Sequence, residues 1–545
     1  LGTYPNANQG PDGVCWPPAT TLGETTMVPI RSPLPPVAVP DVDLPTFLLA
    51  HPPEWADRPA YVDGPSGRAV TFGALAGTAR RFAAGLAARG FRHGDVLAIL
   101  APNLPEWPIA MLGAQLAGGV VTPVNPLWTV GEIAEQLRGS GARAVVTVAP
   151  FLDLATAAAG HAELIVLGAA PAGTVGFAEL IAGDAPEPRV AIDPAVDVAM
   201  LPYSSGTSGP PKGVRLTHRN LVTNVCQCHA VLAPTPDDVL LGALPFFHAA
   251  GFCSSVCLTL LTGATVVTMP RFDLEQALGL VETHRVTVLP AAPPIVLGLA
   301  RHPAVDRFDL TSLDFVICGS APLSAAVESA CAARLGRPVV QVYGLTETSP
   351  IVSICRRDGT GHTPGAVGTL VPNTEVRLVD PVDGTELAPG ATGELWVRGG
   401  QVMAGYLDDP EATAATVDQQ GWLHTGDLGT VSTEGEVFVT DRVKELIKVS
   451  GFQVAPAELE GLLTGHPAVA DAAVIGRPDP ESGERPVAYV VARGELDADE
   501  LIGWAAERSA GYKRLAEVVV IDAVPRSPAG KILRRQLRQA SAARA

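Results

Sequence analysis

The strongest constraint on the fold is an alternation of helical and strand-like segments in two separate blocks of the chain. In the first block, residues 71–90 place apolar side chains at the period of an α-helix, between an N-cap at Thr71 and a glycine stop at Gly90. The apolar run at 95–100 is typical of a buried strand, and the same helix-to-strand step then recurs. A second block of this kind covers 239–336. Such alternation predicts parallel sheets covered by helices, and hence two similar α/β subdomains.

The chain changes character twice after these blocks. From about residue 365, glycine-punctuated patterns predict β-strands, and from 441 a mixture of helical and strand patterns predicts a small α+β unit. We therefore expect an N-terminal domain at 27–440 and a C-terminal domain at 441–545. Residues 1–26 have no periodic apolar face, so we interpret them as an irregular leader or a remnant before a native start at Met27.

Charge and composition disfavour several classes of function. Acidic side chains outnumber basic ones by 56 − 38 = 18, which disfavours a general surface for nucleic acid or anionic membrane. No apolar stretch reaches the ~20 residues that span a bilayer, and the start lacks the pattern of a secretion signal. The eight cysteines lack the paired CxxC spacing of a zinc site, so we expect them to be reduced and buried. These features predict a cytoplasmic protein that binds no nucleic acid and spans no membrane.

The segment SSGTSGPPKG at 204–213 is rich in hydroxyl groups and glycine, lies between a strand pattern and a helix start, and ends in a basic residue. Successive backbone N–H groups of a glycine-rich turn form a concave site for phosphate oxygens, and a lysine adds a movable positive charge. A Walker A loop requires glycine before its lysine and Ser or Thr after it, whereas Pro211 and Gly213 flank Lys212. The segment therefore predicts a phosphate site of another kind, with a surface linker as the alternative.

Four further motifs follow this segment along the chain. They are YGLTETSP (343–350), GWLHTGDLG (421–429), DRVKELIKVSGFQVAPAELE (441–460) and PRSPAGKILRR (525–535). Together with YSSGTSGPPKGVRLTHRN (203–220), they resemble in order and spacing the adenylate-forming (ANL) acyl-CoA synthetase superfamily. The closest branch by resemblance is that of the 4-coumarate–CoA ligases and their bacterial relatives, and the similarity covers residues from about 41 to 539.

The resemblance implies an ATP-dependent carboxylate–CoA ligase. The acid attacks the α-phosphate of ATP to give an acyl-adenylate and pyrophosphate, and coenzyme A then displaces AMP. ATP, Mg²⁺ and coenzyme A are the implied cosubstrates, with a small carboxylic acid as partner and a monomer or homodimer as the assembly. The strands after residue 365 would form a β-barrel-like subdomain, and the C-terminal domain would be a mobile lid that pivots at 441–444.

Nucleotide and metal contacts also follow from the resemblance. The Thr346 hydroxyl would donate to the α-phosphate, Glu347 and Thr207 would hold Mg²⁺, and Asp427 would accept the ribose hydroxyls beside Arg442. The segment CGSAPLS at 318–324 resembles the wall of an adenine pocket. The ATP/AMP-binding set is Ser204, Ser205, Gly206, Thr207, Ser208, Gly209, Lys212, Gly319, Ser320, Ala321, Gln341, Val342, Tyr343, Gly344, Thr346, Asp427, Arg442, Lys444 and Gln453.

Two faces of the C-terminal domain would serve the two steps. Lys531 would neutralise charge during adenylation, whereas KVSGFQV at 448–454 would face the site for thioester formation. The implied coenzyme A contacts are Arg271, Ser450 and Gly451, and Ser450 stands where the family often has lysine. The catalytic set is Lys531, Thr346, Glu347, His248 and Lys448.

Substrate preference is expected to depend on the segment after His248. The plant ligases carry HIY where this chain reads HAA, so Ala250 replaces their phenol-binding tyrosine. This loss predicts an apolar aryl, arylacrylic or medium-chain acid. The alternatives are an acyl-AMP ligase that loads a carrier protein, a luciferase-like oxygenase and a non-enzymatic nucleotide-binding regulator. The predicted acyl pocket is Ala249, Ala250, Phe252, Val342, Pro350, Ile351 and Val352.

Overall fold

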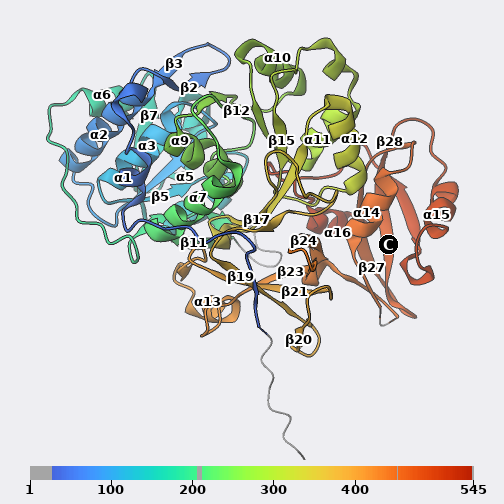
Figure 1. Cartoon of the computed structure of the whole chain (residues 1–545). Coiled ribbons are helices and arrows are strands. Elements are labelled where there is room, and N and C mark those ends of the chain that lie inside the picture. Colours follow the sequence, from blue (N-terminus) through green and yellow to red (C-terminus); the bar gives the residue numbers. More distant parts are fainter. Residues whose placement is uncertain (1–27, 205–210, 451, 543–545) are drawn as a thin grey trace, which may run out of the picture.

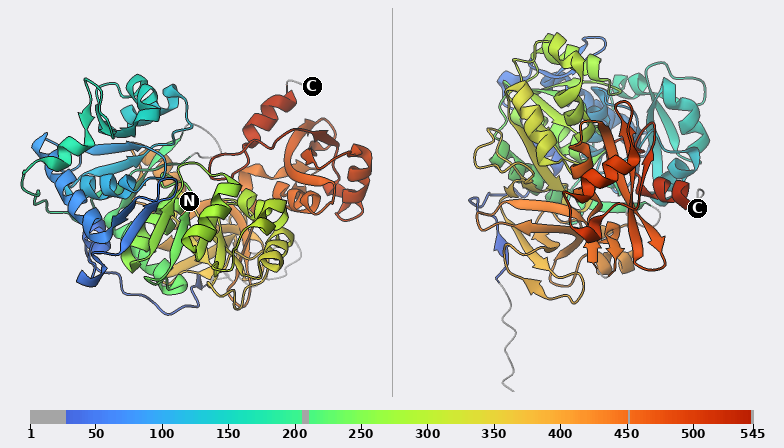
Figure 2. Two further views of the ribbon diagram at one scale, coloured as in Figure 1. Left: turned by 90° about the horizontal axis from the view of Figure 1, so that it is seen from above. Right: turned by 90° about the vertical axis from the view of Figure 1, so that its right-hand side faces the viewer.

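The computed structural model describes residues 28–204, 211–450 and 452–542. They form a large N-terminal domain of three subdomains and a smaller C-terminal domain (Figure 1). The two views in Figure 2 show the C-terminal domain as a separate lobe beside the other three. The predicted leader, the loop residues 205–209 and Gly451 lie outside the described residues.

The first subdomain is built on a nine-stranded sheet, and its central strands are parallel as the alternation predicts. Thr71 caps the longest helix by accepting a hydrogen bond from the Ala74 N–H. The strand order is β10 (Tyr203–Ser204), β11 (Lys212–Thr217), β9 (Val198–Met200), β5 (Val120–Pro123), β4 (Val96–Leu100), β6 (Ala142–Val148), β7 (Glu163–Leu167) and β8 (Val175–Gly176), with β22 (Gly405–Tyr406) beside β11. The helices are α1 (Leu44–Leu48), α2 (Phe72–Ala88), α3 (Glu106–Leu116), α4 (Val130–Gly139), α5 (Leu152–Ala158), α6 (Phe177–Ala182) and α7 (His218–Leu232).

The second subdomain repeats this architecture around another nine-stranded sheet, which confirms the second predicted block. The strand order is β18 (Thr369–Leu370), β17 (Ile351–Ile354), β16 (Val339–Gly344), β15 (Phe315–Cys318), β14 (Val288–Ala291), β12 (Val239–Gly242), β13 (Thr265–Thr268), β2 (Pro59–Asp63) and β3 (Ala69–Thr71). The helices are α8 (Ala249–Phe252), α9 (Thr259–Thr262), α10 (Leu274–His284), α11 (Pro293–Arg301) and α12 (Ala325–Leu335). A π-helical turn, Cys253–Leu258, joins α8 to α9, so the three segments form one continuous but locally widened helix.

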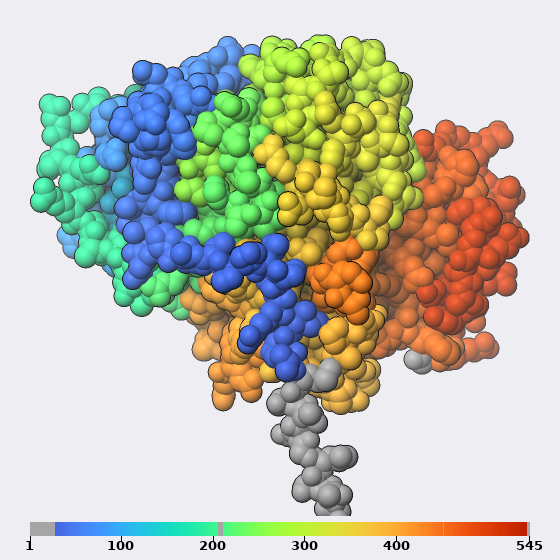
Figure 3. All heavy atoms as spheres, in the orientation of Figure 1, coloured from blue at the N-terminus to red at the C-terminus, as the bar shows by residue number. Residues whose placement is uncertain are grey.

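The third subdomain is an antiparallel sheet, as the glycine-punctuated pattern predicts. Its order is β1 (Ile30–Arg31), β19 (Thr374–Val379), β21 (Gly393–Gly399), β23 (Leu423–Val431) and β24 (Val437–Arg442), with β20 (Glu386–Leu387) beside β19. Helix α13 (Pro410–Thr416) precedes β23. The N-terminal segment from residue 28 crosses the surface from this sheet towards the first subdomain (Figure 3), where the Leu44 N–H donates to His218 Nδ1.

The C-terminal domain has its own small sheet and its own core. The strand order is β26 (Phe452–Val454), β25 (Ile447–Val449), β28 (Gly483–Ala492) and β27 (Val469–Asp479), with β29 (Glu517–Val520) parallel to β28. The helices are α14 (Pro456–Thr464), α15 (Ala498–Ala506) and α16 (Arg534–Ala542). Strand β24 of the third subdomain ends at Arg442 and β25 starts at Ile447, so the connection between the domains is four residues long.

The first two subdomains share one core, and this seam positions the segment before α8. Trp107 of α3 is fully buried, with its ring centroid 6.0 Å from that of Phe246 and 6.4 Å from that of Phe252. The Asn103 side chain donates to the carbonyls of Gly242, at the end of β12, and Leu244, and it accepts from the Phe246 N–H, each at 2.8 Å. These buried contacts bind the chain on both sides of His248 to the first subdomain.

Two further predictions concern membrane-spanning helices and the state of the cysteines. Within the described ranges, no helix is long and apolar enough to cross a membrane. Seven of the cysteines are described; they form no disulfide with one another, and six of them are buried, as their spacing predicts.

Candidate active site

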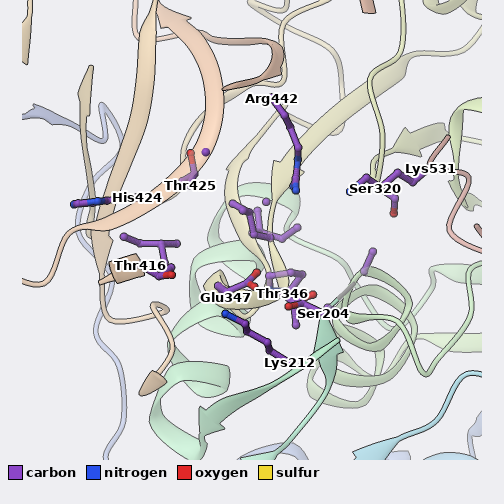
Figure 4. Close-up of a pocket in the computed structure, with 18 of the residues that line it drawn as sticks. Ser204, Lys212, Ser320, Thr346, Glu347, Thr416, His424, Thr425, Arg442 and Lys531 are labelled. Atoms are coloured by element: carbon purple, nitrogen blue, oxygen red, sulfur yellow. The ribbon is translucent and has the colours of Figure 1, made fainter. Parts of the chain in front are cut away.

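A cavity of about 540 Å³ opens where the carboxyl ends of β15 and β16 meet β23 and the C-terminal domain. Ligands of parallel α/β sheets bind at this edge because strand ends and loops converge there. Figure 4 shows the labelled side chains around one central space, with Lys531 and Ser320 on one side and His424 on the opposite side. All three N-terminal subdomains and the C-terminal domain contribute residues to the lining.

One end of the cavity collects the cationic and hydroxyl groups that phosphate oxygens require. Lys212 and Ser204 reach it from β11 and β10, and Thr346 and Glu347 reach it from the loop after β16. Lys212 Nζ lies 3.5 Å from Asp409 Oδ2 and 5.1 Å from the centroid of the Tyr406 ring. These contacts hold the ammonium group at the cavity wall, and both partners come from the neighbourhood of β22.

Glu347 is held by a single hydrogen bond to its side chain. The Tyr406 hydroxyl donates to Glu347 Oε1 at 3.0 Å, and the second carboxylate oxygen accepts no hydrogen bond from the described residues. Within that part of the chain, no group of three or more His, Cys, Asp or Glu side chains could hold a metal ion by itself. A carboxylate with one free oxygen beside a phosphate site matches the way Mg²⁺ is shared between a protein and a nucleotide.

A buried network lies behind the cavity at β23 and β24. Arg442 Nε lies 2.9 Å from Asp427 Oδ1, and the Tyr343 hydroxyl donates to Asp427 Oδ2 at the same distance. Burial raises the pKa of Asp427 above its usual value, and the charge of Arg442 opposes that shift. Arg442 lines the cavity, whereas Asp427 lies directly after the lining residues Thr425 and Gly426.

Of the predicted segment 319–321, Ser320 lines the cavity, whereas Gly319 and Ala321 lie outside the lining. A Cβ placed on Gly319 would lie 3.1 Å from Val342 Cγ2, so a larger residue would crowd that side chain. Ser320 has φ +72° and lines the cavity, and its buried hydroxyl has no hydrogen-bond partner among the described residues. An unpartnered polar group at a cavity wall is a natural contact for a polar ligand.

Lys531 enters the cavity from the C-terminal domain. It follows a turn in which Gly530 has φ +84°, and the Ser527 N–H donates to the Lys531 carbonyl at 2.8 Å. Burial, together with the positive charge of Arg442, lowers the pKa of Lys531 to about 8. The turn therefore presents an amine that is charged at neutral pH and held where solvent screening is weak.

His248 lines the cavity at the N-terminus of α8. Its Nδ1 accepts a hydrogen bond from the Ala250 N–H at 3.4 Å. Burial, with a smaller contribution from Lys531, lowers the pKa of His248 to about 4, so the imidazole is neutral at physiological pH. The predicted pocket residues Ala249, Ala250, Val342, Pro350 and Ile351 also line the cavity.

Several predicted residues lie away from the lining. Gln341 is buried and donates to Glu328 Oε2 at 2.6 Å, and Ala321 and Tyr343 also lie outside the lining, although Tyr343 bonds Asp427. Phe252 packs against Trp107 instead of the cavity. Val352 is buried on the opposite face of β17 from Ile351, because alternate residues of a strand point to opposite faces.

The predicted thioester-step residues also lie outside the cavity. Lys448 and Gln453 are exposed and face each other across the β25–β26 pair, and Ser450 at its turn is exposed with φ +50°. Arg271 is exposed and forms no ion pair with any described residue. The lining does include Lys444, beside the connection between the domains.

Apart from Arg442, the lining residues from the third subdomain and from β22 were not predicted from the sequence. His424 and Thr425 stand inside a quoted motif next to Asp427, so the motif itself was the available signal. His424 stacks on Trp396 with the ring centroids 3.6 Å apart. Tyr406 and Glu394 carried no such signal, because each reaches the cavity only through the packing of β22 and β21.

Two protein-family models match the chain. The model described as "AMP-binding enzyme" matches residues 49–407, and the one described as "AMP-binding enzyme C-terminal domain" matches residues 458–531. The two matches fall on either side of the connection between β24 and β25.

Proteins of known name and structure are similar over almost the whole chain. The 4-coumarate–CoA ligase 5 of Oryza sativa subsp. japonica is 44% identical over 525 residues, covering 94% of this chain and 97% of that protein. The crystal structure of ATP-bound MatB from Rhodopseudomonas palustris has a TM-score of 0.83 at 32% identity, covering 91% of this chain and 98% of that one. The anthranilate CoA ligase AuaEII in complex with anthranoyl-AMP has a TM-score of 0.85 at 26% identity, with coverages of 93% and 98%.

Proposed function

Because the chain belongs to the AMP-binding enzymes and is an ATP-dependent acid–CoA ligase, we propose that its acid is an apolar aryl, arylacrylic or medium-chain carboxylic acid. The enzyme uses ATP, Mg²⁺ and coenzyme A as its other substrates. The observation that carries the proposal is the small apolar part of the cavity lining: Ala249, Ala250 and Ile351 line it together with His248, which is neutral.

In the first step, a carboxylate oxygen of the acid bonds to the α-phosphorus of ATP while the bond to the bridging oxygen of pyrophosphate breaks. Lys531 stabilises the negative charge that builds up when the two anions approach each other, because its partly buried side chain already lines the cavity. Thr346 donates its hydroxyl to the α-phosphate, and Lys212 accompanies the departing pyrophosphate. Water is excluded by the C-terminal domain, which covers the cavity when Lys531 lies inside it.

The nucleotide and the metal would occupy the polar end. Asp427 and Arg442 would take the ribose hydroxyls, and the Ser320 hydroxyl would take a polar atom of the nucleotide. Glu347 would hold Mg²⁺ through its free oxygen together with phosphate oxygens. When bound, Mg²⁺ neutralises charge on the phosphates; Thr207, the second predicted ligand, lies outside the described residues.

In the second step, the coenzyme A sulfur bonds to the carbonyl carbon of the acyl-adenylate, AMP leaves and the thiol proton is lost. We propose that the C-terminal domain turns about 441–444 between the steps and brings the β25–β26 pair, with Lys448 and Ser450, to the cavity. The exposure of Lys448 in the present orientation supports the proposal, since its ammonium group forms no ion pair with any described residue and is available for another contact. Arg271 would take a phosphate of coenzyme A.

Neutral walls argue for an apolar acid. Ala249, Ala250 and Ile351 offer no side-chain hydrogen-bond donor or acceptor, so a phenolic hydroxyl placed here would lose its water partners without replacement. The relatives named 4-coumarate–CoA ligase and anthranilate CoA ligase support an aromatic acid. A cytoplasmic enzyme, as a monomer or homodimer, accords with the use of ATP and coenzyme A and with free cysteines.

A panel of carboxylic acids tests the substrate class. The enzyme is incubated with ATP, Mg²⁺ and coenzyme A, and kcat/KM is measured for cinnamate, 4-coumarate, benzoate, phenylacetate and a series of linear acids. We expect cinnamate or a comparably apolar acid to equal or exceed 4-coumarate. A preference of about 100-fold for 4-coumarate would contradict the proposal, because that ratio requires a buried partner for the phenol.

A further inference from the structure

An arginine of the N-terminal domain caps a helix of the C-terminal domain. Arg301 is the last residue of α11, and its Nη2 donates to the carbonyl of Thr464 at 2.8 Å. Thr464 is the last residue of α14, so its carbonyl is one of those left without a partner inside the helix. Arg301 Nη1 also lies 3.5 Å from the carbonyl of Val469. A cation at a helix C-terminus is favourable because that end carries partial negative charge.

Helix α11 contacts the C-terminal domain at its other end as well. A Cβ placed on Gly530, the residue before Lys531, would lie 3.0 Å from Ala292 Cβ and 3.2 Å from Pro294 Cδ. Nine helical residues span about 13 Å, so the two contacts are well separated on one rigid element. A third contact joins Ser324, before α12, to Gly461 of α14. Three separated contacts define the orientation of a rigid domain, whereas one would permit rotation.

We propose that Arg301 is a positioning residue: it holds the C-terminal domain in the orientation that places Lys531 in the cavity. This inference rests on the proposed function, in which the domain turns between the two steps. In any orientation that brings the β25–β26 pair to the cavity, α14 moves with the domain and leaves Arg301. The contact therefore favours one step of the reaction and is broken for the other.

The hydrogen bonds of Arg301 are of a kind that can break and form again in every turnover. Arg301 meets neutral carbonyls, and none of the carboxylates in the described ranges forms an ion pair with it. Burial, together with the nearby Arg493, lowers the pKa of Arg301. A strong ion pair would keep the C-terminal domain in one orientation. Hydrogen bonds to neutral carbonyls favour that orientation but still allow the domain to turn.

Arg301→Ala tests the proposal through the two half-reactions measured separately. The adenylation rate, measured by pyrophosphate exchange, should fall by about tenfold, which corresponds to the loss of one charge-assisted hydrogen bond. Thioester formation from supplied acyl-adenylate and coenzyme A should stay the same or rise. Arg301→Lys should restore part of the adenylation rate. Arg307→Ala is the matched control, because Arg307 pairs with Glu275 inside the N-terminal domain.

The outcomes separate this proposal from the proposed function. An equal fall in both half-reactions, or an unchanged adenylation rate, would overturn the role of Arg301, while activity with an acid, ATP and coenzyme A would still stand. A wild-type enzyme that forms no adenylate with any apolar acid would instead overturn the proposed function.

A disulfide between α14 and the start of α12 gives a second test. A Cβ placed on Gly461 would lie 3.6 Å from Ser324 Cβ, within the range that a disulfide spans. In the variant Ser324→Cys/Gly461→Cys, oxidation should allow adenylation and stop thioester formation until a reductant is added. Arg301→Ala should then lose its effect in the oxidised protein and regain it on reduction. A persistent effect in the oxidised protein, or failure of the disulfide to form, would contradict the proposal.

Discussion

The Lys531 turn and the β25–β26 pair are two parts of one small domain, but only the Lys531 turn contributes to the cavity lining. Lys531 is partly buried and lines the cavity, with a pKa of about 8, whereas Lys448, Gln453 and Ser450 are exposed to solvent. Both parts belong to motifs that are equally clear in the sequence. A rigid domain can present only one face to a site at a time. This difference is the basis of our proposal that the present orientation serves adenylation and that the exposed face serves a later step.

Removing Lys531 should give the largest effect and should fall on one half-reaction. Lys531→Ala deletes a partly buried cation where negative charge concentrates, so adenylation should fall by about 1,000-fold in pyrophosphate exchange. Thioester formation from supplied acyl-adenylate should persist, because that step uses the other face. Arg526→Ala is a poor control, since its Nη1 donates to the Gly530 carbonyl; the exposed Arg485 is a better one. Equal loss of both half-reactions would break the comparison.

Removing Lys448 should give the opposite pattern, a loss of thioester formation instead of adenylation, and a smaller effect. In Lys448→Ala, thioester formation from supplied acyl-adenylate should fall by about 100-fold, because the substitution deletes a positioned charge that acts only after the domain turns. Adenylation should be unchanged, since Lys448 is exposed and outside the cavity. Arg485→Ala again serves as the control, being an exposed cation on the same domain. A fall in adenylation would mean that Lys448 reaches the cavity in the present orientation.

The fold could be predicted largely because its signals are local. The helix from Phe72 begins where the Thr71 side chain caps it, and the strand at 96–100 is apolar enough to be recognised without its neighbours. Motifs likewise indicated Lys531, Thr346 and Glu347, because the order and spacing of those motifs resemble a known family, and all three residues line the cavity. The strand orders could not be read in this way, because sheet neighbours are chosen by tertiary packing.

The rest of the site depends on which way a side chain points. Gln341 is adjacent to Val342, yet Glu328 binds its amide away from the cavity while Val342 lines it. Tyr406 lines the cavity because β22 pairs with β11, a contact between residues almost 200 positions apart. Neither outcome follows from spacing along the chain. The orientation of the C-terminal domain could not be predicted either, because it depends on contacts between the two domains and not on any single motif.

The pH dependence gives the smallest effect and the most selective test, because the titration of Lys531 should change the rate of adenylation and leave the rate of thioester formation unchanged. A lysine is charged below its pKa, so Lys531 with a pKa of about 8 loses its charge as the pH rises through 8. We expect kcat/KM for adenylation to fall by about tenfold per pH unit above that point, since kcat/KM reports groups of the free enzyme. His248, with a pKa of about 4, is neutral throughout and adds no inflection between pH 5 and 9. Lys531→Arg should be slower but flat, because a guanidinium stays charged. If thioester formation from supplied acyl-adenylate shows the same inflection, Lys531 serves both steps, and the division of labour between the two faces is wrong.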